Sequence, residues 1–222
     1  MAYPTKVFSA DRNKNQDHPF YTLRVVLTGK VDNLMLNHNE PCGIIVFGAN
    51  GSGKTTLGRE LARVMRFKHM DIEDYHFADS EIPYTVERSR EECLSLMLAD
   101  IEKYRSFVIS AVTGDFGDTI TSFYKLAVCV EAPIELRMKR IKQRAYDLHG
   151  RRVLPGGDMY EQNMKFLDFA AARSLSGIEE WAKTLACPVI RVDGACAAQY
   201  AADIAERFYE ITNHLLTAIY EK

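Results

Sequence analysis

The sequence lacks the features of exported and membrane-embedded proteins. Met1 to Phe20 contain no apolar stretch of signal-peptide length, and no run of about eighteen consecutive apolar residues occurs anywhere. The five cysteines are odd in number and show neither a C-x-x-C pair nor the spacing of a Cys/His metal site. We therefore expect a cytoplasmic protein with reduced thiols and without a membrane partner.

The chain also lacks a strong net charge, internal repeats and low-complexity tracts. Its 28 basic and 30 acidic residues give a formal net charge of −2. A balanced charge provides no overall positive field for a phosphate backbone, so we expect no nucleic-acid partner and disfavour phosphorylation of nucleic-acid ends. With 222 residues, 47% of them hydrophobic, the chain can form one large or two small domains.

Short apolar runs alternate with amphipathic stretches from residue 43 onward. The runs that predict strands are 43–47, 67–70, 107–112, 126–130 and 189–192. Four stretches predict helices: one begins after residue 53, two lie at 87–103 and 133–146, and one lies in the C-terminal segment. Strands separated by helices favour an α/β fold, here a five-stranded parallel sheet with helices on both faces.

Two further expectations concern the helix at 87–103 and the first forty residues. Leu94, Leu98 and Ile101 recur at a spacing that predicts one buried helix face. Residues 1–40 do not follow the alternating pattern, although Tyr21 to Val31 could add one strand. We expect an N-terminal extension of unknown role at 1–40 and one domain at 41–222.

Residues 48–55 match the pattern G-x-x-x-x-G-K-[ST]. The motif follows a predicted buried strand and opens a helix, which favours a phosphate loop over a plain glycine-rich turn. Its backbone N–H groups would bind phosphate, Lys54 would neutralise the β and γ phosphates, and the Thr55 hydroxyl would bind Mg²⁺. We predict ATP and Mg²⁺ as cofactors. The predicted ATP-binding residues of the loop are Gly48, Asn50, Gly51, Ser52, Gly53, Lys54, Thr55 and Thr56.

With this motif, the chain from about Pro41 onward resembles the small P-loop kinases of the adenylate kinase-like group. That group includes nucleoside monophosphate, shikimate and gluconate kinases. The stretch 154–160 is also similar to one in bacterial proteins known only as ATPases or kinases. The resemblance implies a P-loop nucleotide hydrolase fold, an acceptor region at about 72–106, and a lid at about 147–160.

Asp71, Glu73 and His76 follow the second predicted strand. In the gluconate and shikimate kinases, an Asp-x-Asp at this place puts one carboxylate near Mg²⁺ and the next near the acceptor. By that likeness Asp71 supports the metal, Glu73 binds the acceptor, and His76 matches a histidine of gluconate kinases. Alternate residues of an extended segment face the same way, so we expect both carboxylates in one site. A solvated acidic turn is the alternative.

Ser110 and Asp115 follow the third predicted strand, where the related kinases line the acceptor pocket. We assign both to acceptor binding, with a flexible turn capped by Asp118 as the alternative. The strand itself, 107–112, contains no acidic residue, so the usual position for a metal-supporting carboxylate is empty. This places the metal-supporting role on Asp71.

Arg137, Arg140 and Arg144 are spaced to share one helix face. By the resemblance, Arg140 stacks on adenine and Arg144 faces the phosphates. Arg151 and Arg152 would lie in the lid. A solvated basic face is the alternative, since lysines 139 and 142 belong to the same helix.

The glycines and proline of 150–157 predict a mobile loop that closes over the reacting groups. Asp158 and Glu161 have the spacing of a capping box, which would begin the next helix at Asp158. Asp193 and Gly194, after the fifth predicted strand, resemble the turn whose backbone meets the adenine edge in such kinases.

The sequence predicts transfer of the ATP γ-phosphoryl group to a small-molecule acceptor, with Lys54, Asp71 and Arg144 as catalytic residues. The substitution of Glu73 for the family's aspartate leaves the acceptor open among nucleotides, sugar acids and similar hydroxyl compounds. The alternative is an ATP-hydrolysing switch or sensor that acts through a protein partner.

Overall fold

The computed structural model describes residues 40–78 and 86–220. The expected N-terminal extension, with its added strand at 21–31, lies outside these residues except for its last position. A central sheet contains β1 (Cys42–Phe47), β2 (Lys68–Asp71), β3 (Ser106–Ala111), β4 (Tyr124–Glu131) and β5 (Val189–Asp193). Its order is β2-β3-β1-β4-β5 and all neighbouring strands are parallel, which confirms the predicted fold class.

Helices connect the successive strands, as a parallel sheet requires. The α-helices are α1 (Lys54–Met65), α2 (Ile72–His76), α3 (Arg90–Tyr104), α4 (Asp118–Thr121), α5 (Ile134–His149), α6 (Tyr160–Ala172), α7 (Ser176–Lys183) and α8 (Ala201–Tyr220). Two short 3₁₀ helices are η2 (Gly150–Val153) and η3 (Ala197–Tyr200). No described helix is both long enough and apolar enough to cross a bilayer.

Both faces of the sheet are covered, because every residue of β1 is buried and successive side chains point to opposite faces. Ile44 and Val46 pack with side chains of α1 and α8 on one face. Ile45 and Phe47 pack with side chains of α2, α3 and α7 on the other. This three-layer packing fixes the position of the loop that follows β1.

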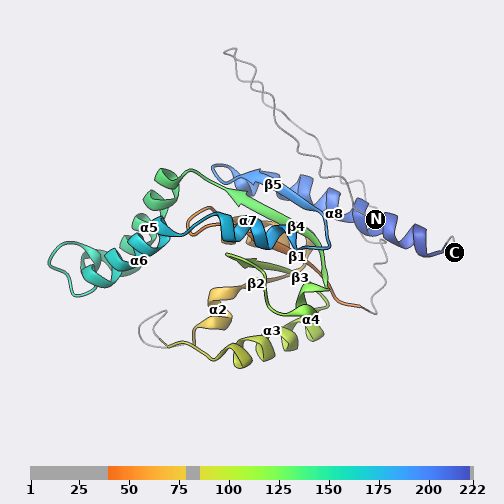
Figure 1. Cartoon of the computed structure of the whole chain (residues 1–222), viewed down its shortest axis with the longest axis horizontal. Coiled ribbons are helices and arrows are strands. Elements are labelled where there is room, and N and C mark those ends of the chain that lie inside the picture. Colours follow the sequence, from red (N-terminus) through yellow and green to blue (C-terminus); the bar gives the residue numbers. More distant parts are fainter. Residues whose placement is uncertain (1–39, 79–85, 221–222) are drawn as a thin grey trace, which may run out of the picture.

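The carboxyl ends of all strands lie at one edge of the sheet. In Figure 1 the strand arrows point toward the arm formed by α5 and α6, which projects from this edge. The loop 48–53 follows β1, α2 follows β2, and residues 194–196 follow β5. Ligands of open parallel sheets bind at this edge, so the fold brings the predicted site residues to one side.

The predicted buried face of α3 is wrong at Leu98. Ser89 caps the helix, with Glu92 completing a capping box, and the buried side chains are Cys93, Met97 and Ile101. Leu98 lies one position beyond this narrow stripe and is 38% exposed. The buried side chains follow a single i, i+4, i+8 row, while Leu94 beside this row is partly buried against the core and Leu98 lies toward solvent.

The predicted extended conformation of 71–73 is also wrong. β2 ends at Asp71, whose side chain caps α2 by accepting a hydrogen bond from the Glu73 N–H. Glu73 therefore lies in the first turn of a helix. The two carboxylates nevertheless face one cavity, because a capping residue and the first turn of its helix are adjacent.

Asp158 does not cap the helix that follows it. α6 begins at Tyr160, and the Asp158 carboxylate instead accepts hydrogen bonds from Arg152 Nε and Nη2 at 2.6 to 3.1 Å. A bidentate guanidinium–carboxylate pair is stronger than a single capping hydrogen bond, which explains why the Asp158 carboxylate pairs with Arg152 and does not cap α6. The pair joins the two ends of the loop between η2 and α6.

Candidate functional site

The loop 48–55 wraps around the amino end of α1. Lys54 reaches back across the loop, and its Nζ donates to the Ala49 carbonyl oxygen at 2.9 Å. Gly51 and Gly53 have φ angles of 77° and 109°, which side chains other than hydrogen disfavour. A Cβ on Gly51 would also lie 2.6 Å from the Arg137 carbonyl oxygen, so the loop packs directly against α5.

Two arginines of α5 hold the outer side of this loop. Arg137 is buried and its Nη1 donates to the Asn50 carbonyl oxygen at 3.4 Å. Arg140 donates to the Ser52 carbonyl at 3.1 Å and to the Ala195 carbonyl at 3.5 Å. The predicted arginine face is therefore directed at the phosphate loop, while lysines 139 and 142 are exposed. These bonds engage the carbonyl oxygens of Asn50 and Ser52 from the side of α5.

Two polar side-chain atoms of the loop are buried without a hydrogen-bond partner among the described residues. They are Asn50 Oδ1 and Ser52 Oγ. Buried polar atoms are paired in more than about nine cases of ten, and the exceptions concentrate at sites that bind something. The loop therefore carries hydrogen-bonding capacity that a bound ligand can use.

A cavity of about 320 Å³ opens above the loop and collects most of the predicted site residues. Its walls come from the loop and α1, from the end of β2 and the start of α2, from the end of β3, and from α5. The lining residues are Asn50, Gly51, Gly53, Lys54, Thr55, Thr56, Asp71, Ile72, Glu73, Ser110, Ala111, Val112, Arg140, Ile141 and Arg144.

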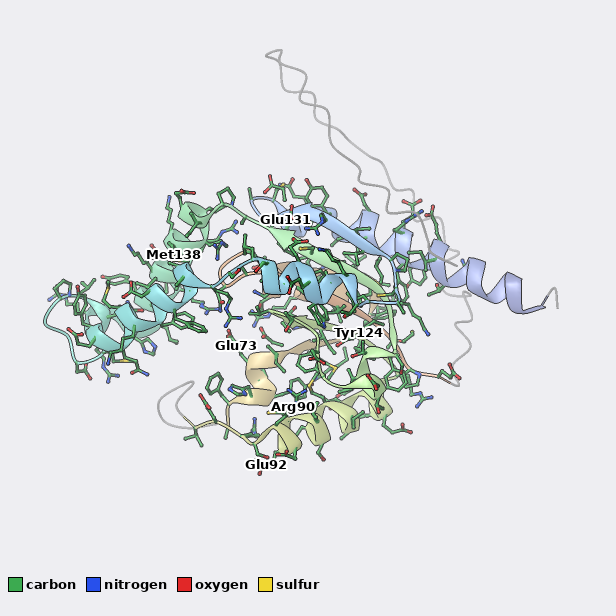
Figure 2. All side chains as sticks on the ribbon, in the orientation of Figure 1. Glu73, Arg90, Glu92, Tyr124, Glu131 and Met138 are labelled. Atoms are coloured by element: carbon green, nitrogen blue, oxygen red, sulfur yellow. The ribbon has the colours of Figure 1, made fainter. Side chains whose placement is uncertain are left out.

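Asp71, Glu73 and Arg144 form the charged wall opposite the phosphate loop. Asp71 is only 6% exposed, and Arg144 Nη1 lies 3.9 Å from Glu73 Oε2. Burial raises the pKa of Glu73, while the Arg144 guanidinium opposes this shift. Figure 2 shows Glu73 on α2, facing the space between this helix and the α5–α6 arm. Carboxylates and a guanidinium thus line the same cavity as Lys54.

Lys54 is poorly solvated in this cavity. Burial lowers the pKa of its ammonium group to about 8, although the carboxylates of Glu73 and Asp71 raise it in part. A lysine whose charge is under-compensated gains most from a bound anion, because the anion replaces the lost solvation. The electrostatics of the site therefore favour phosphate binding.

Ser110 lies at the cavity floor, but its hydroxyl is already engaged. It is 1% exposed and lies 3.0 Å from His69 Nε2 and 3.4 Å from the Lys54 carbonyl oxygen. Gly58 of α1 makes room for this pair, since a Cβ there would lie 2.1 Å from Ser110 Oγ. Sequence reasoning missed His69, because only strand register reveals that it meets Ser110.

Several predicted residues do not line this cavity. His76 is partly exposed, packs on the Phe77 ring and lies 3.9 Å from Glu87. Asp115 is exposed, and its backbone carbonyl accepts a bond from Arg90. Arg151 and Arg152 are exposed, with Arg152 paired to Asp158. Arg151 and Arg152 lie between α5 and α6 in the arm, which extends beyond the sheet edge (Figure 1).

The turn after β5 contacts the phosphate loop through its backbone. Asp193 Oδ1 accepts the Ala195 N–H at 2.8 Å, which fixes the turn. A Cβ on Gly194 would lie 2.3 Å from the Ser52 carbonyl oxygen. Asp193 and Gly48 line a neighbouring cavity of about 490 Å³ rather than the cavity above the loop.

Arg173, which sequence reasoning did not single out, also belongs to the electrostatic surroundings of the site. Its positive charge lowers the pKa of Lys54. Its Nε is buried without a hydrogen-bond partner among the described residues, and its guanidinium lies over the Phe169 ring. No sequence pattern indicates this residue, because only the fold returns the end of α6 to the sheet edge.

The chain is similar to several known proteins. One relative, the uncharacterized protein YqaC of Bacillus subtilis, is 29% identical over 168 residues, which cover 72% of this chain and 93% of the relative. The shikimate kinase of Acinetobacter baumannii is similar in structure with a TM-score of 0.47 and 18% identity, covering 78% of this chain and 95% of that chain. A gluconokinase from Sinorhizobium meliloti gives a TM-score of 0.43 and 14% identity, with coverages of 81% and 96%.

The AAA domain family matches residues 44–165, which is more than half of the chain. The match includes the phosphate loop, both carboxylates of the cavity wall and all three arginines of α5. It also agrees with the parallel sheet whose first strand leads into the loop. The predicted resemblance to P-loop proteins of the adenylate kinase-like type is thereby confirmed, and the chain belongs to the AAA domain family.

Proposed function

We propose that this protein transfers the γ-phosphoryl group of ATP to a hydroxyl group of a small-molecule acceptor. The observation that carries the proposal is the single cavity above the phosphate loop, where Lys54 of the loop shares the lining with Asp71, Glu73 and Arg144. Phosphoryl transfer depends on positioning and on neutralising the charge of the transferring group. Two cations and two carboxylates around one cavity supply both.

Each charged side chain receives a role from its surroundings. Lys54 and the loop N–H groups bind the phosphates, and Arg144 stabilises the group in transfer. Glu73, beside Arg144 on the cavity wall, orients the acceptor hydroxyl by hydrogen bonding. Asp71 accepts the proton of that hydroxyl or holds metal-bound water, and Arg140 contacts the adenine side while tying the loop to Ala195.

The residues present fit Mg²⁺. Thr55 and Asp71 offer a hydroxyl and a carboxylate oxygen to the same cavity, and hard oxygen ligands are those that Mg²⁺ prefers. When bound, the ion would neutralise phosphate charge. The remaining residues of the wall bind and orient the two substrates and exclude water from them.

The test measures ADP release with purified protein, ATP and Mg²⁺ against a panel of nucleosides, nucleotides, sugar acids and other hydroxyl compounds. Acceptor-dependent ADP release is expected with one class. Lys54→Met should abolish it, with a circular dichroism spectrum equal to that of the unchanged chain. Thr121→Ala, in α4 and away from the cavity, serves as the matched control and should retain turnover.

A flat response across the panel would contradict the proposed transfer. If ADP release were instead stimulated by a protein partner, the chain would act as an ATP-hydrolysing switch. Retained turnover in a folded Lys54→Met variant would overturn the role assigned to this lysine.

A further inference from the structure

A second cavity, of about 240 Å³, lies beside the phosphate cavity. It is formed between α2, the second half of α5, the segment 153–159 and α6. Glu73, Ile141 and Arg144 line both cavities. The ion pair of Glu73 and Arg144 therefore stands at the passage from one to the other.

The two cavities differ in chemistry. The phosphate cavity is lined mainly by the loop and by charged side chains. The second cavity is lined mainly by large apolar side chains, which are Phe77, Ile141, Leu148, Val153, Met159 and Phe166. Its polar groups away from the passage are His149, Gln162 and Asn163. An acceptor that reaches the phosphate through this passage leaves its body in an apolar environment.

Two of these apolar side chains are more exposed to solvent than apolar side chains in a protein core. Leu148 is 49% exposed and Phe166 is 37% exposed. Apolar pockets with a few polar groups at one end are typical of sites that bind small ligands. A polyhydroxylated acceptor would lose hydrogen bonds to water here without replacement, whereas an apolar body would gain by leaving water.

We propose that the acceptor is a hydroxyl compound with an apolar or aromatic ring rather than a sugar acid or another polyol, an inference that rests on the proposed phosphoryl transfer. The ring lies in the cavity between α2, α5 and α6. The hydroxyl lies at the passage, next to Glu73 and Arg144. Gln162 and Asn163 hydrogen-bond whatever polar substituents the ring carries.

The test is direct binding, which needs no turnover. Saturation-transfer NMR is recorded on the full chain with 2-phenylethanol and with xylitol as probes. Transfer to the phenyl protons is expected, with little transfer to xylitol. Phe166→Gln and Leu148→Gln should each weaken phenylethanol binding by about tenfold, because a ring contact of this size is lost.

Tyr146→Gln is the matched control. Tyr146 belongs to α5, is 46% exposed like Leu148, and does not line the cavity. Its variant should bind phenylethanol as the unchanged chain does, and this result would also show that substitutions on the arm preserve the fold. Circular dichroism of all three variants checks the fold directly.

Equal transfer to xylitol, or phenyl transfer that persists in both cavity variants, would overturn the inference. Failure of the proposed function gives a different result. In that case ADP release stays flat across the acceptor panel, while phenyl transfer remains sensitive to Phe166→Gln and the apolar ligand site stands. ADP release that depends on a sugar acid but on no ring compound would support the phosphoryl transfer and overturn the acceptor class.

Discussion

The charge of Lys54 is disfavoured by its own surroundings. Burial lowers the pKa of this lysine to about 8 from an ordinary value of 10.5. Between these two values the folded chain binds fewer protons than the unfolded chain, so this group increases the free energy of unfolding as the pH rises. A bound phosphate favours the charged form and raises the pKa again. Nucleotide binding should therefore be coupled to proton uptake above pH 8.

This coupling gives the first prediction. At pH 8.5 the binding of ATP should take up about three quarters of a proton, and nucleotide affinity should fall as the pH rises further. Titration calorimetry in two buffers with different ionisation enthalpies measures the uptake. Lys54→Arg, whose guanidinium stays protonated, should bind ATP without proton uptake. Identical uptake in both proteins would show that another group titrates.

Gly194 offers a second prediction at the level of one atom. A Cβ at this position would lie 2.3 Å from the Ser52 carbonyl oxygen and 2.9 Å from the Glu131 carbonyl oxygen. Because both neighbours are backbone, Gly194→Ala should lower the free energy of unfolding by about 1 to 3 kcal/mol and weaken ATP binding. Urea unfolding and calorimetry measure the two effects.

Gly177→Ala is the control for this substitution. Gly177 belongs to α7, and a Cβ there would have no atom within 4 Å. Its variant should keep ATP binding and gain up to about 1 kcal/mol of stability, since alanine favours a helix over glycine. Equal stability of Gly194→Ala and the unchanged chain would mean that the turn after β5 can move away from the loop.

At the scale of residues, the features that could be predicted from the sequence are those that a short continuous motif specifies. The phosphate loop is one continuous motif, so its position and flanking elements were predictable. The partners of Arg140 and Ser110 were not, because they come from segments 41 to 88 positions away. We expected Asp71 and Glu73 to share one site because alternate residues of an extended segment face the same way. Both do line one cavity, but Glu73 lies in a helix and not in an extended segment.

At the scale of elements, α2 depends on a residue outside it. The Arg88 guanidinium donates through Nη1 to the carbonyl oxygens of Asp74, Tyr75 and Phe77 at 2.5 to 3.1 Å. A helix of five residues does not form alone, since its nucleation is unfavourable. Arg88 therefore holds three carbonyls at the end of the helix, and the Cys93 thiol also donates to the Tyr75 carbonyl.

The third prediction concerns this tether. Arg88→Gln should increase amide hydrogen exchange in residues 72–77, because hydrogen bonds from a charged group are lost. It should also weaken the acceptor binding that we propose for Glu73. Hydrogen exchange monitored by mass spectrometry measures the local effect. Arg90→Gln is the control, since Arg90 contacts the Asp115 carbonyl and not α2. Equal exchange in both variants would show that α2 is held by its packing alone.

The strands were easier to predict than the helices for a physical reason. Buried strands of a parallel sheet are continuous apolar runs, and all five lie within two residues of their expected bounds. Short helices such as α2 have no periodic signal, because their stability comes from caps and neighbours. The exposed Leu98 shows what a helical pattern cannot predict. The spacing of apolar residues does not tell how much of the helix surface contacts the core.

At the scale of the whole molecule, the net charge of −2 conceals a separation of charge. The phosphate cavity has Lys54, Arg140 and Arg144 on its walls together with Asp71 and Glu73. Composition excludes a strongly basic surface but says nothing of such a local arrangement. The second cavity was beyond prediction for a similar reason, because it is assembled from α2, α5 and α6 across about ninety residues of chain.

The last prediction concerns the division at residue 40. The described residues already cover both faces of the central sheet, with every residue of β1 buried, and residues 50–144 line the phosphate cavity. A chain that begins at residue 40 should therefore fold, with a thermal transition of the same cooperativity, and should bind ATP with the affinity of the full chain. Calorimetry of the two proteins compares both quantities. Loss of folding would mean that the first 39 residues complete the core, and unchanged folding with altered ATP turnover would assign them a regulatory role instead.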